Sequence, residues 1–153
     1  MRILVCGSRN WVDADCVRLH LAMRLYSAAE RVVIHGGATG ADTLAGLNAP
    51  LCGAAVEAFP VDHAVDGPWP SAGPRRNARM LRDGKPTHGL AFGPLYRDLG
   101  GKGLATARVT GTGDMVRRMI AANLHVRWIP DPWTHFEDLL SMPVAVGRAV
   151  LAA

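Results

Sequence analysis

Residues 32–42 read Val-Val-Ile-His-Gly-Gly-Ala-Thr-Gly-Ala-Asp, and this stretch decides the fold. Its first three residues are β-branched and apolar, which is typical of a short strand buried in the core. Three glycines follow, and a helical pattern begins near Ala41. A buried strand that passes through a glycine-rich turn into a helix is the start of a βαβ unit, so the stretch predicts a parallel sheet covered by helices.

The same alternation extends to both sides of this stretch. Short apolar runs predict strands at residues 3–6, 32–34, 55–59, 87–92 and 125–129. Helical patterns lie between them at about 13–29, 41–50, 74–84 and 113–123. Because crossovers between parallel strands are right-handed, few topologies remain. We predict a Rossmann-like α/β domain of three layers over residues 1–130, with about five parallel strands in the order 3-2-1-4-5.

Apolar side chains at helical spacing mark one face of three of these helices. They are Val17, Leu21 and Leu25 in the first helix, Leu44, Leu47 and Leu51 in the second, and Met115, Met119, Ile120 and Leu124 in the last. Asp13 is placed to cap the first helix, and Pro50 ends the second.

Two segments have no clear structure from their sequence. Residues 93–111 are rich in glycine and form either a lid that places Lys102 on a phosphate or a mobile loop. The C-terminal extension, residues 131–153, either covers the sheet edge or forms an oligomer contact.

The composition is that of a globular protein with one domain. Of the 153 residues, 49% are apolar and 20% are charged, which argues against intrinsic disorder. The net charge of +4 permits an anionic ligand such as a phosphate. Without a run of Lys and Arg, this charge does not by itself indicate nucleic-acid binding.

The cysteines and histidines have no spacing typical of a metal site. The three cysteines are far apart, and none of the six histidines stands at ligand spacing from another histidine or a cysteine. We therefore expect no metal ion, and no motif indicates a cofactor. Free thiols suit a reducing compartment, and no apolar run approaches the length of a membrane span. We expect a cytoplasmic protein that does not enter a membrane.

The candidate binding residues lie after the predicted strands. In open parallel sheets, ligands bind beyond the carboxyl ends of the strands, where the strand order switches. The loop after the first strand offers Gly7, Ser8 and Arg9, which either contact a phosphate or form a simple turn. The loop after the second strand offers the strongest signal, namely Gly36, Gly37, Ala38, Thr39, Gly40 and Asp42. Its exposed backbone and the helix start favour a phosphate or sugar, with Asp42 either capping the helix or binding a ribose hydroxyl.

Two later segments complete the candidate site. Gly111, Thr112, Gly113 and Asp114 precede the last helix, where exposed amides again favour a phosphate, and Asp114 is either a cap or a functional carboxylate. In the third helix, spacing alone indicates a solvated basic face at Arg75, Arg79 and Arg82. Arg76 and Asn77, near the helix start, are the two residues of this segment that can reach into the crevice.

Taken together, these blocks resemble the YspA-like branch of the SLOG superfamily, which includes the DNA-processing protein DprA and the Lonely Guy phosphoribohydrolases. The matching blocks are residues 2–9, 33–42, 73–80, 90–92 and 111–116. The resemblance covers about residues 1–130 and implies a Rossmann-like fold that binds nucleotide-derived ligands. It favours a functional role for Arg76 and Asn77, and it implies a homodimer or larger homo-oligomer.

One motif departs from the pattern of the Lonely Guy enzymes, Pro-Gly-Gly-x-Gly-Thr-x-x-Glu. Here Met115 stands where that glutamate falls, and Asp114 lies one residue early. Three functions therefore stay open. The chain is a sensor or sequestering protein for a nucleotide, or a phosphoribohydrolase-like enzyme in which Asp114 stabilises the sugar cation and Arg76 holds the phosphate. Single-stranded DNA binding ranks third, because the sequence shows no basic stripe.

Overall fold

The central sheet has the predicted strand order. The computed structural model describes residues 1–98 and 107–132. Its five parallel strands are β1 (Arg2–Gly7), β2 (Val32–His35), β3 (Ala55–Ala58), β4 (His88–Phe92) and β7 (His125–Ile129). They lie in the order β3-β2-β1-β4-β7, which is the expected 3-2-1-4-5 arrangement. In the central strand, Leu4 stands between Ile34 of β2 and Gly89 of β4.

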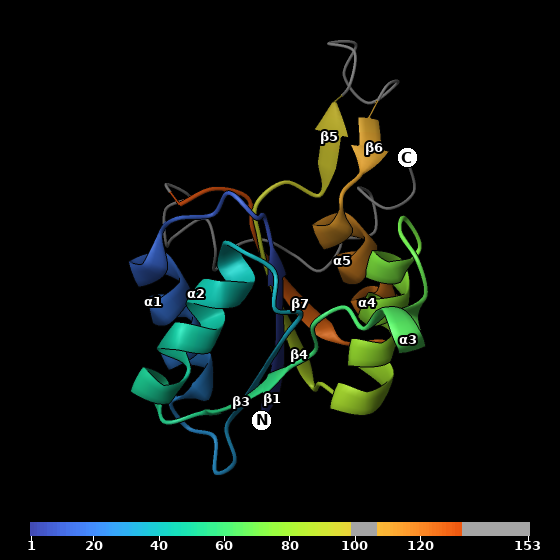
Figure 1. The fold of residues 1–153 in the computed structure, drawn as a ribbon. Coiled ribbons are helices and arrows are strands. Elements are labelled where there is room, and N and C mark those ends of the chain that lie inside the picture. Colours follow the sequence, from blue (N-terminus) through green and yellow to red (C-terminus); the bar gives the residue numbers. More distant parts are fainter. Residues whose placement is uncertain (99–106, 133–153) are drawn as a thin grey trace.

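Helices cover both faces of this sheet, so the three-layer prediction is confirmed (Figure 1). One layer consists of α1 (Ala14–Leu25) and α2 (Ala41–Asn48), followed by a short 3₁₀ turn, η1 (Pro50–Cys52). The other consists of α4 (Ala72–Gly84) and α5 (Gly111–Ala121), with the one-turn helix α3 (His63–Asp66) beside α4. No helix in the described ranges has the length and hydropathy of a membrane span.

Two apolar cores lie on the two faces of the sheet. Alternate residues of β1 point to opposite faces, so Ile3 and Val5 join one core while Leu4 joins the other. The predicted face of α1 is buried against the first core through Val17, Leu21 and Leu25. The second core contains Met80, Met115 and Met119 from α4 and α5. Burial on both faces explains why the strands are continuous apolar runs.

Of the apolar face expected for the second helix, Leu44 packs against the first core, but the other two leucines do not. Leu47 and Leu51 are exposed, at 66% and 72% of their surface, whereas Ala41 and Ala45 are fully buried. Gly7 explains this orientation, because a side chain there would overlap Ala41. The missing side chain lets α2 pack closely on β1 through its alanines.

Other differences from the sequence prediction have local causes. The first helix ends at Leu25, about one turn earlier than expected, because the Arg31 guanidinium takes the carbonyl oxygens of Tyr26 and Ala28 as acceptors. The segment expected to lack structure contains an antiparallel hairpin of β5 (Tyr96–Asp98) and β6 (Ala107–Val109). Lys102 lies outside the described residues, and so do residues 133–153, which make up most of the predicted C-terminal extension.

Candidate functional site

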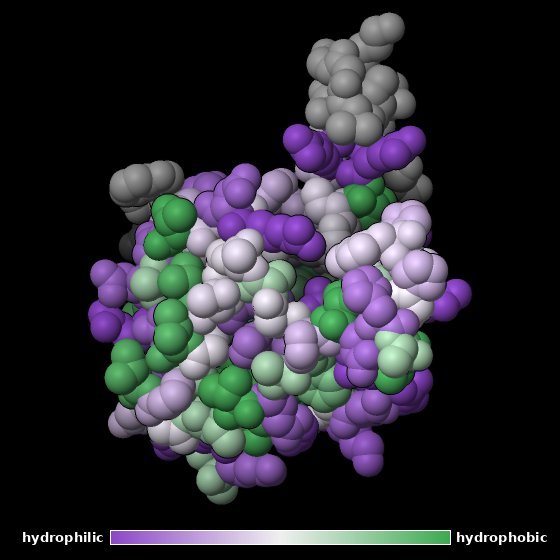
Figure 2. All heavy atoms as spheres, viewed as in Figure 1, coloured by the Kyte–Doolittle hydropathy of each residue, from purple (hydrophilic) through white to green (hydrophobic). Residues whose placement is uncertain are grey.

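A cleft of about 870 Å³ opens at the carboxyl ends of the strands, next to the switch in strand order between β1 and β4. The loops after β1, β2, β3 and β4 line it, together with parts of α4 and α5. Figure 2 shows the recess near the centre of this face, with hydrophilic residues around it. The cleft therefore lies where ligands bind in open α/β sheets.

Most of the residues predicted from the sequence meet in this cleft. Those that line it are Gly7, Ser8, Arg9, Gly36, Gly37, Ala38, Asp42, Arg76, Asn77, Gly111, Thr112 and Asp114. Thr39, Gly40 and Gly113 are not part of the lining. Gly40 packs against the backbone of Ser8 and Arg9, and Gly113 packs under the carbonyl group of Leu95, so both serve close backbone contacts.

The loop after β2 is closed by its own aspartate. Asp42 Oδ2 accepts hydrogen bonds from the amides of Gly36 (2.9 Å) and Ala38 (3.3 Å), and the Gly37 amide donates to Nδ1 of His35 (3.1 Å). Three successive amides that the sequence offered to a phosphate are therefore satisfied within the protein. Asp42 is buried, and burial raises the pKa of its carboxyl group to about 6, against the lowering effect of the Ala38 amide and of Arg76.

Arg76 crosses from α4 to the other side of the cleft and contacts this loop. Its Nη1 donates to the carbonyl oxygen of Gly36 and, at 3.3 Å, to that of Phe59. Gly36 has no Cβ, and a Cβ there would overlap the guanidinium group. The Nε atom of Arg76 is buried without an acceptor, and Nη2 has no acceptor among the described residues. These two nitrogen atoms lie on the same edge of the guanidinium group, the edge with which an arginine can bind an oxyanion through two hydrogen bonds.

The start of α5 supplies further donors to the cleft. Thr110 caps the helix, because its Oγ1 accepts from the amide of Gly113 at 3.0 Å. The amides of Gly111 and Thr112 precede the first intrahelical bond and have no acceptor in the described part of the chain. Both residues line the cleft, so the positive end of the helix dipole faces it.

Asn77 joins α4 to α5. The buried Asn77 side chain donates from Nδ2 to Asp114 Oδ2 at 2.9 Å, and Arg118 Nε donates to the same oxygen at 2.9 Å. Asp114 Oδ1 accepts no hydrogen bond from the described residues. Asn77 therefore stabilises the cleft wall by holding Asp114 in place. The Oδ1 atom of Asp114 stays available next to Asn77 in a fixed orientation.

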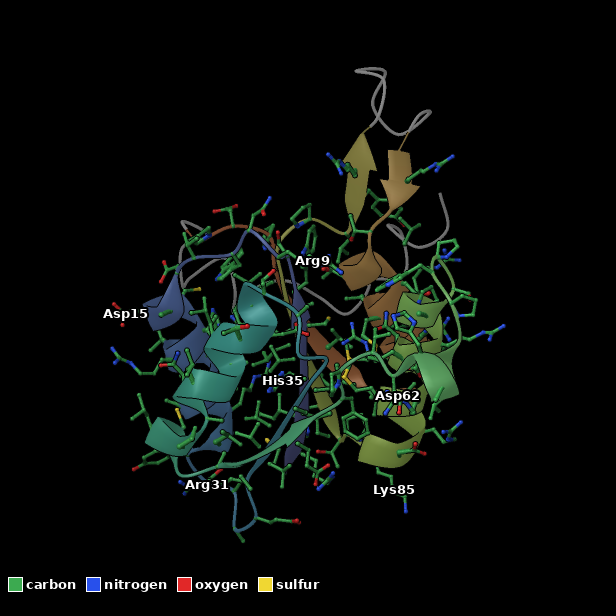
Figure 3. All side chains as sticks on the ribbon, in the orientation of Figure 1. Arg9, Asp15, Arg31, His35, Asp62 and Lys85 are labelled. Atoms are coloured by element: carbon green, nitrogen blue, oxygen red, sulfur yellow. The ribbon has the colours of Figure 1, made fainter. Side chains whose placement is uncertain are left out.

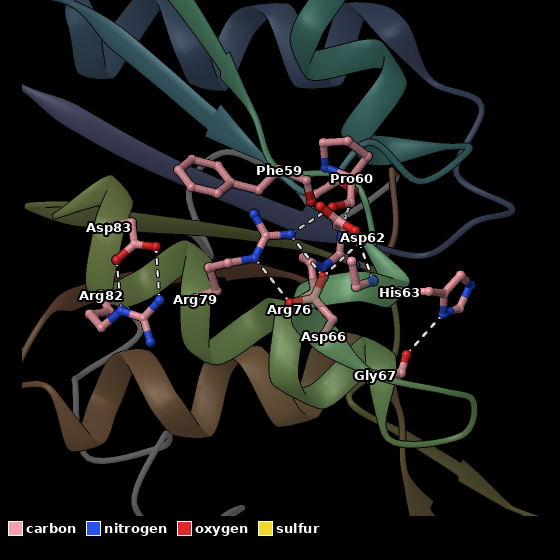
Figure 4. Close-up of polar contacts among 12 residues, drawn as sticks. Phe59, Pro60, Asp62, His63, Asp66, Gly67, Arg76, Arg79, Arg82 and Asp83 are labelled. Atoms are coloured by element: carbon pink, nitrogen blue, oxygen red, sulfur yellow. Dashed lines mark hydrogen bonds and ion pairs between the residues drawn. The ribbon is translucent and has the colours of Figure 1, made fainter.

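The interpretation of Arg79 as a solvated residue is wrong. Arg79 makes a bidentate ion pair with Asp66 of α3, with distances of 3.0 and 2.8 Å, and it also donates to the carbonyl oxygen of Pro60 (Figure 4). Asp66 is buried, and the hydrogen bonds from Arg79 lower its pKa to about 2. Arg82, in contrast, is 71% exposed, and within the described ranges it pairs only with its neighbour Asp83, as a surface residue does. The Arg79–Asp66 pair fixes the segment before α4 and so positions Arg76.

Sequence reasoning missed several residues of the cleft wall. Trp69, which is 56% exposed, lines the opening, and its ring lies 5.9 Å from that of His63. Arg97 comes from β5, and Arg117 comes from the outer side of α5. No local sequence signal identifies these three residues as part of a site, because each contributes to the cleft only through the packing of segments that are far apart in the sequence. Among the described residues, no three His, Cys, Asp or Glu side chains lie close enough together to hold a metal ion.

Comparison with known proteins relates the chain to one family. The model of the YspA, cpYpsA-related SLOG family matches residues 1–64, which include both glycine-bearing loops after β1 and β2. The "Gene 61 protein" of Mycobacterium phage D29 is 42% identical over 105 residues, which cover 65% of this chain and 81% of that protein.

A solved structure extends the similarity of fold to the rest of the chain. The X-ray structure of DNA processing protein A (DprA) from Streptococcus pneumoniae superposes with a TM-score of 0.59 at 18% identity, over 99% of this chain. The match covers 55% of DprA, so this chain spans about half of its length. At this identity the likeness concerns the fold, and it includes α4 and α5, which lie beyond the family match.

Proposed function

This chain belongs to the YspA, cpYpsA-related SLOG family, and on that premise we propose that its cleft binds a nucleotide or nucleotide-derived small molecule. The protein holds this ligand without changing it, as a sensor or a sequestering protein does. Family membership supports nucleotide-related binding in general. The contacts inside the cleft support a phosphate-bearing ligand in particular.

The guanidinium edge of Arg76 carries this proposal. A buried donor without an acceptor costs free energy, about 1 to 3 kcal/mol for a polar group. Arg76 keeps its Nε in that condition while its Nη1 fixes the side chain to Gly36 and Phe59. An arginine that is held rigidly with a free bidentate edge is suited to bind a phosphate oxyanion. The start of α5 adds two free amides in the same cleft.

The aromatic residue at the opening suits the other end of a nucleotide. Trp69 presents more than half of its surface at the edge of the cleft, where a base can stack on the indole ring. A phosphate at Arg76 and a base at Trp69 place the two chemically distinct parts of a nucleotide on different walls.

Binding is tested by calorimetry with a panel of nucleotides, followed by chromatography and mass spectrometry of the recovered ligand. Arg76→Gln should weaken binding about 10- to 100-fold, because it removes a charge-assisted bidentate contact. Arg82→Gln on the same helix is the matched control, since Arg82 is exposed and pairs only with Asp83. Equal affinity in the wild type and in Arg76→Gln, or no binding of any nucleotide, contradicts the proposal.

A phosphoribohydrolase-like activity is the second candidate, and the geometry of Asp114 favours it. One carboxylate oxygen is held by Asn77 and Arg118, and the other faces no protein donor among the described residues. Such a carboxylate can stabilise a developing sugar cation or orient water. If the recovered nucleotide has lost its base, Asp114→Asn should abolish that release while binding persists. Intact nucleotide after long incubation with the wild type excludes this candidate.

A further inference from the structure

The cleft carries more positive charge than one phosphate group requires. Its charged lining residues are Arg9, Arg76, Arg97, Arg117, Asp42 and Asp114. They come from five different parts of the fold, namely the loop after β1, the start of the helix α2, the helix α4, the strand β5 and the helix α5. The Arg9 side chain lies at the end of the sheet that faces the hairpin (Figure 3).

Neither carboxylate forms an ion pair with an arginine at the opening among the described residues, although the charge of Arg9 lowers the pKa of the Asp42 carboxyl group. Asp42 is buried and accepts from the amides of its own loop, and Asp114 is paired with Arg118 at 2.9 Å. Arg9, Arg97 and Arg117 are exposed and form no hydrogen bond or ion pair with any residue in the described ranges. All three line the same cleft as Arg76, and none of them has a hydrogen-bond or ion-pair partner in the part of the chain that the structure describes.

The hairpin adds a second, independent sign of an anion. Arg97 stands directly opposite Arg108 in the β5–β6 register. Like charges at opposed positions of an antiparallel pair repel each other. A two-stranded hairpin is only marginally stable alone, so two arginines at its middle pair weaken it unless an anion lies nearby. The hairpin projects beyond the rest of the described chain at the cleft side of the sheet (Figure 1).

We propose that the ligand carries at least two linked phosphate groups, one at Arg76 and the next at Arg97 and Arg117. A nucleoside diphosphate, or two nucleosides joined through a diphosphate, has this chemistry. A cleft of about 870 Å³ has room for a ligand larger than a mononucleotide. This inference rests on the proposed function and specifies its ligand class, because a single phosphate leaves the cations of β5 and α5 without a partner.

The test compares mono- and diphosphates of the same nucleoside. Dissociation constants are measured by calorimetry at fixed ionic strength for AMP, ADP and ADP-ribose, and for the matching guanosine mono- and diphosphates. We expect a diphosphate to bind at least about tenfold more tightly than its monophosphate, since each added charge-assisted contact contributes about 1 kcal/mol or more. In the double variant Arg97→Gln/Arg117→Gln, the ratio of the two constants should fall below about threefold. Arg82→Gln should keep the wild-type ratio.

The outcomes separate this inference from the proposed function. Equal binding of mono- and diphosphates overturns the two-phosphate ligand and leaves nucleotide binding intact, whereas no binding of either overturns the proposed function itself. A twelve-residue oligothymidylate is the third arm. If it binds with a steep salt dependence that the double variant abolishes, while diphosphates bind no better than monophosphates, the arginines serve a nucleic-acid strand and the inference is wrong.

Discussion

The two glycine-bearing loops that flank the cleft look alike in sequence and are built for different purposes. In residues 36–42, two glycines have positive φ, and the amides of residues 36–38 are bonded to Asp42 and His35. In residues 110–114, no glycine has a positive φ, and a threonine cap leaves the first amides of α5 open toward the cleft. The first loop satisfies its backbone amides with its own side chains, and the second is an ordinary helix N-terminus.

This difference changes where a ligand is expected to bind. The loop with more glycines has most of its polar groups satisfied internally, so its glycines serve shape and close packing. Among the described residues that line the cleft, donors without acceptors lie on the opposite wall, at Arg76 and at the start of α5. A glycine-rich turn before a helix therefore indicates the location of the cleft. It is a poorer guide to which groups of the protein contact the ligand.

Gly40→Ala should break the first loop and produce the largest effect. Gly40 has a φ of +76°, and a Cβ there would overlap the backbone carbonyl of Ser8, which cannot move without shifting the β1 loop. We expect the free energy of unfolding, from urea titration, to fall by about 3 kcal/mol. Gly53→Ala is the control, because Gly53 has a φ of +69° but faces only the flexible Arg31 side chain. It should cost about 1 kcal/mol. Equal losses in the two variants would mean that the contact with Ser8 does not matter.

Asp42 should make the stability of the first loop sensitive to pH. The pKa of Asp42 in the folded protein, about 6, lies above the ordinary value of 3.8. Between pH 3.8 and pH 6, the folded protein therefore keeps a proton on Asp42 that the unfolded chain has lost. Stability from this group is present below pH 4 and is lost as the pH rises to about 6, by up to about 3 kcal/mol. Asp42→Asn should remove this part of the pH dependence, because the amide oxygen still accepts from the loop but does not ionise. If the stability difference between the two proteins is constant from pH 4 to 7, Asp42 is not buried as an acid.

The same contrast shows what sequence reasoning reaches. The strand order follows from buried apolar runs and right-handed crossovers and is confirmed, and a cleft lies at the sheet edge where the sequence places the ligand. The residues of the cleft walls are harder to predict, because their positions depend on contacts between segments that are far apart in the sequence. From the sequence alone, Arg79 has the character of a surface charge, because its partner Asp66 lies thirteen residues earlier at the end of the short helix α3. The sequence does not predict Arg97 as a site residue, because the strands of its hairpin are only three residues long. These strands pair across residues 99–106, which the structure does not describe.

Gly36→Ala should separate binding from stability. Gly36 has no positive φ, and a Cβ there would overlap only the end of the Arg76 side chain, which can swing away. The fold should therefore tolerate the change within about 1 kcal/mol, while nucleotide affinity falls about 10- to 100-fold because Arg76 loses its position. Calorimetry and urea titration on the same preparation measure both effects. Wild-type affinity in this variant would show that the contact between Arg76 and Gly36 does not hold the ligand.

Gly111→Ala should have the smallest effect on the free energy of unfolding. We expect this change to stabilise the protein, whereas Gly40→Ala in the first loop destabilises it. No atom lies within 4 Å of a Cβ built at Gly111, and its backbone has no positive φ, although the residue belongs to a Gly-Thr-Gly motif. Alanine at the first helical position restricts the unfolded chain, so stability should rise by about 0.5 kcal/mol. Nucleotide affinity should stay within about threefold, because the amide that faces the cleft is retained. A large loss of nucleotide affinity with normal stability would mean that the ligand itself approaches Gly111 closely. The second loop would then need its glycine for binding, whereas the first loop needs its glycines for folding.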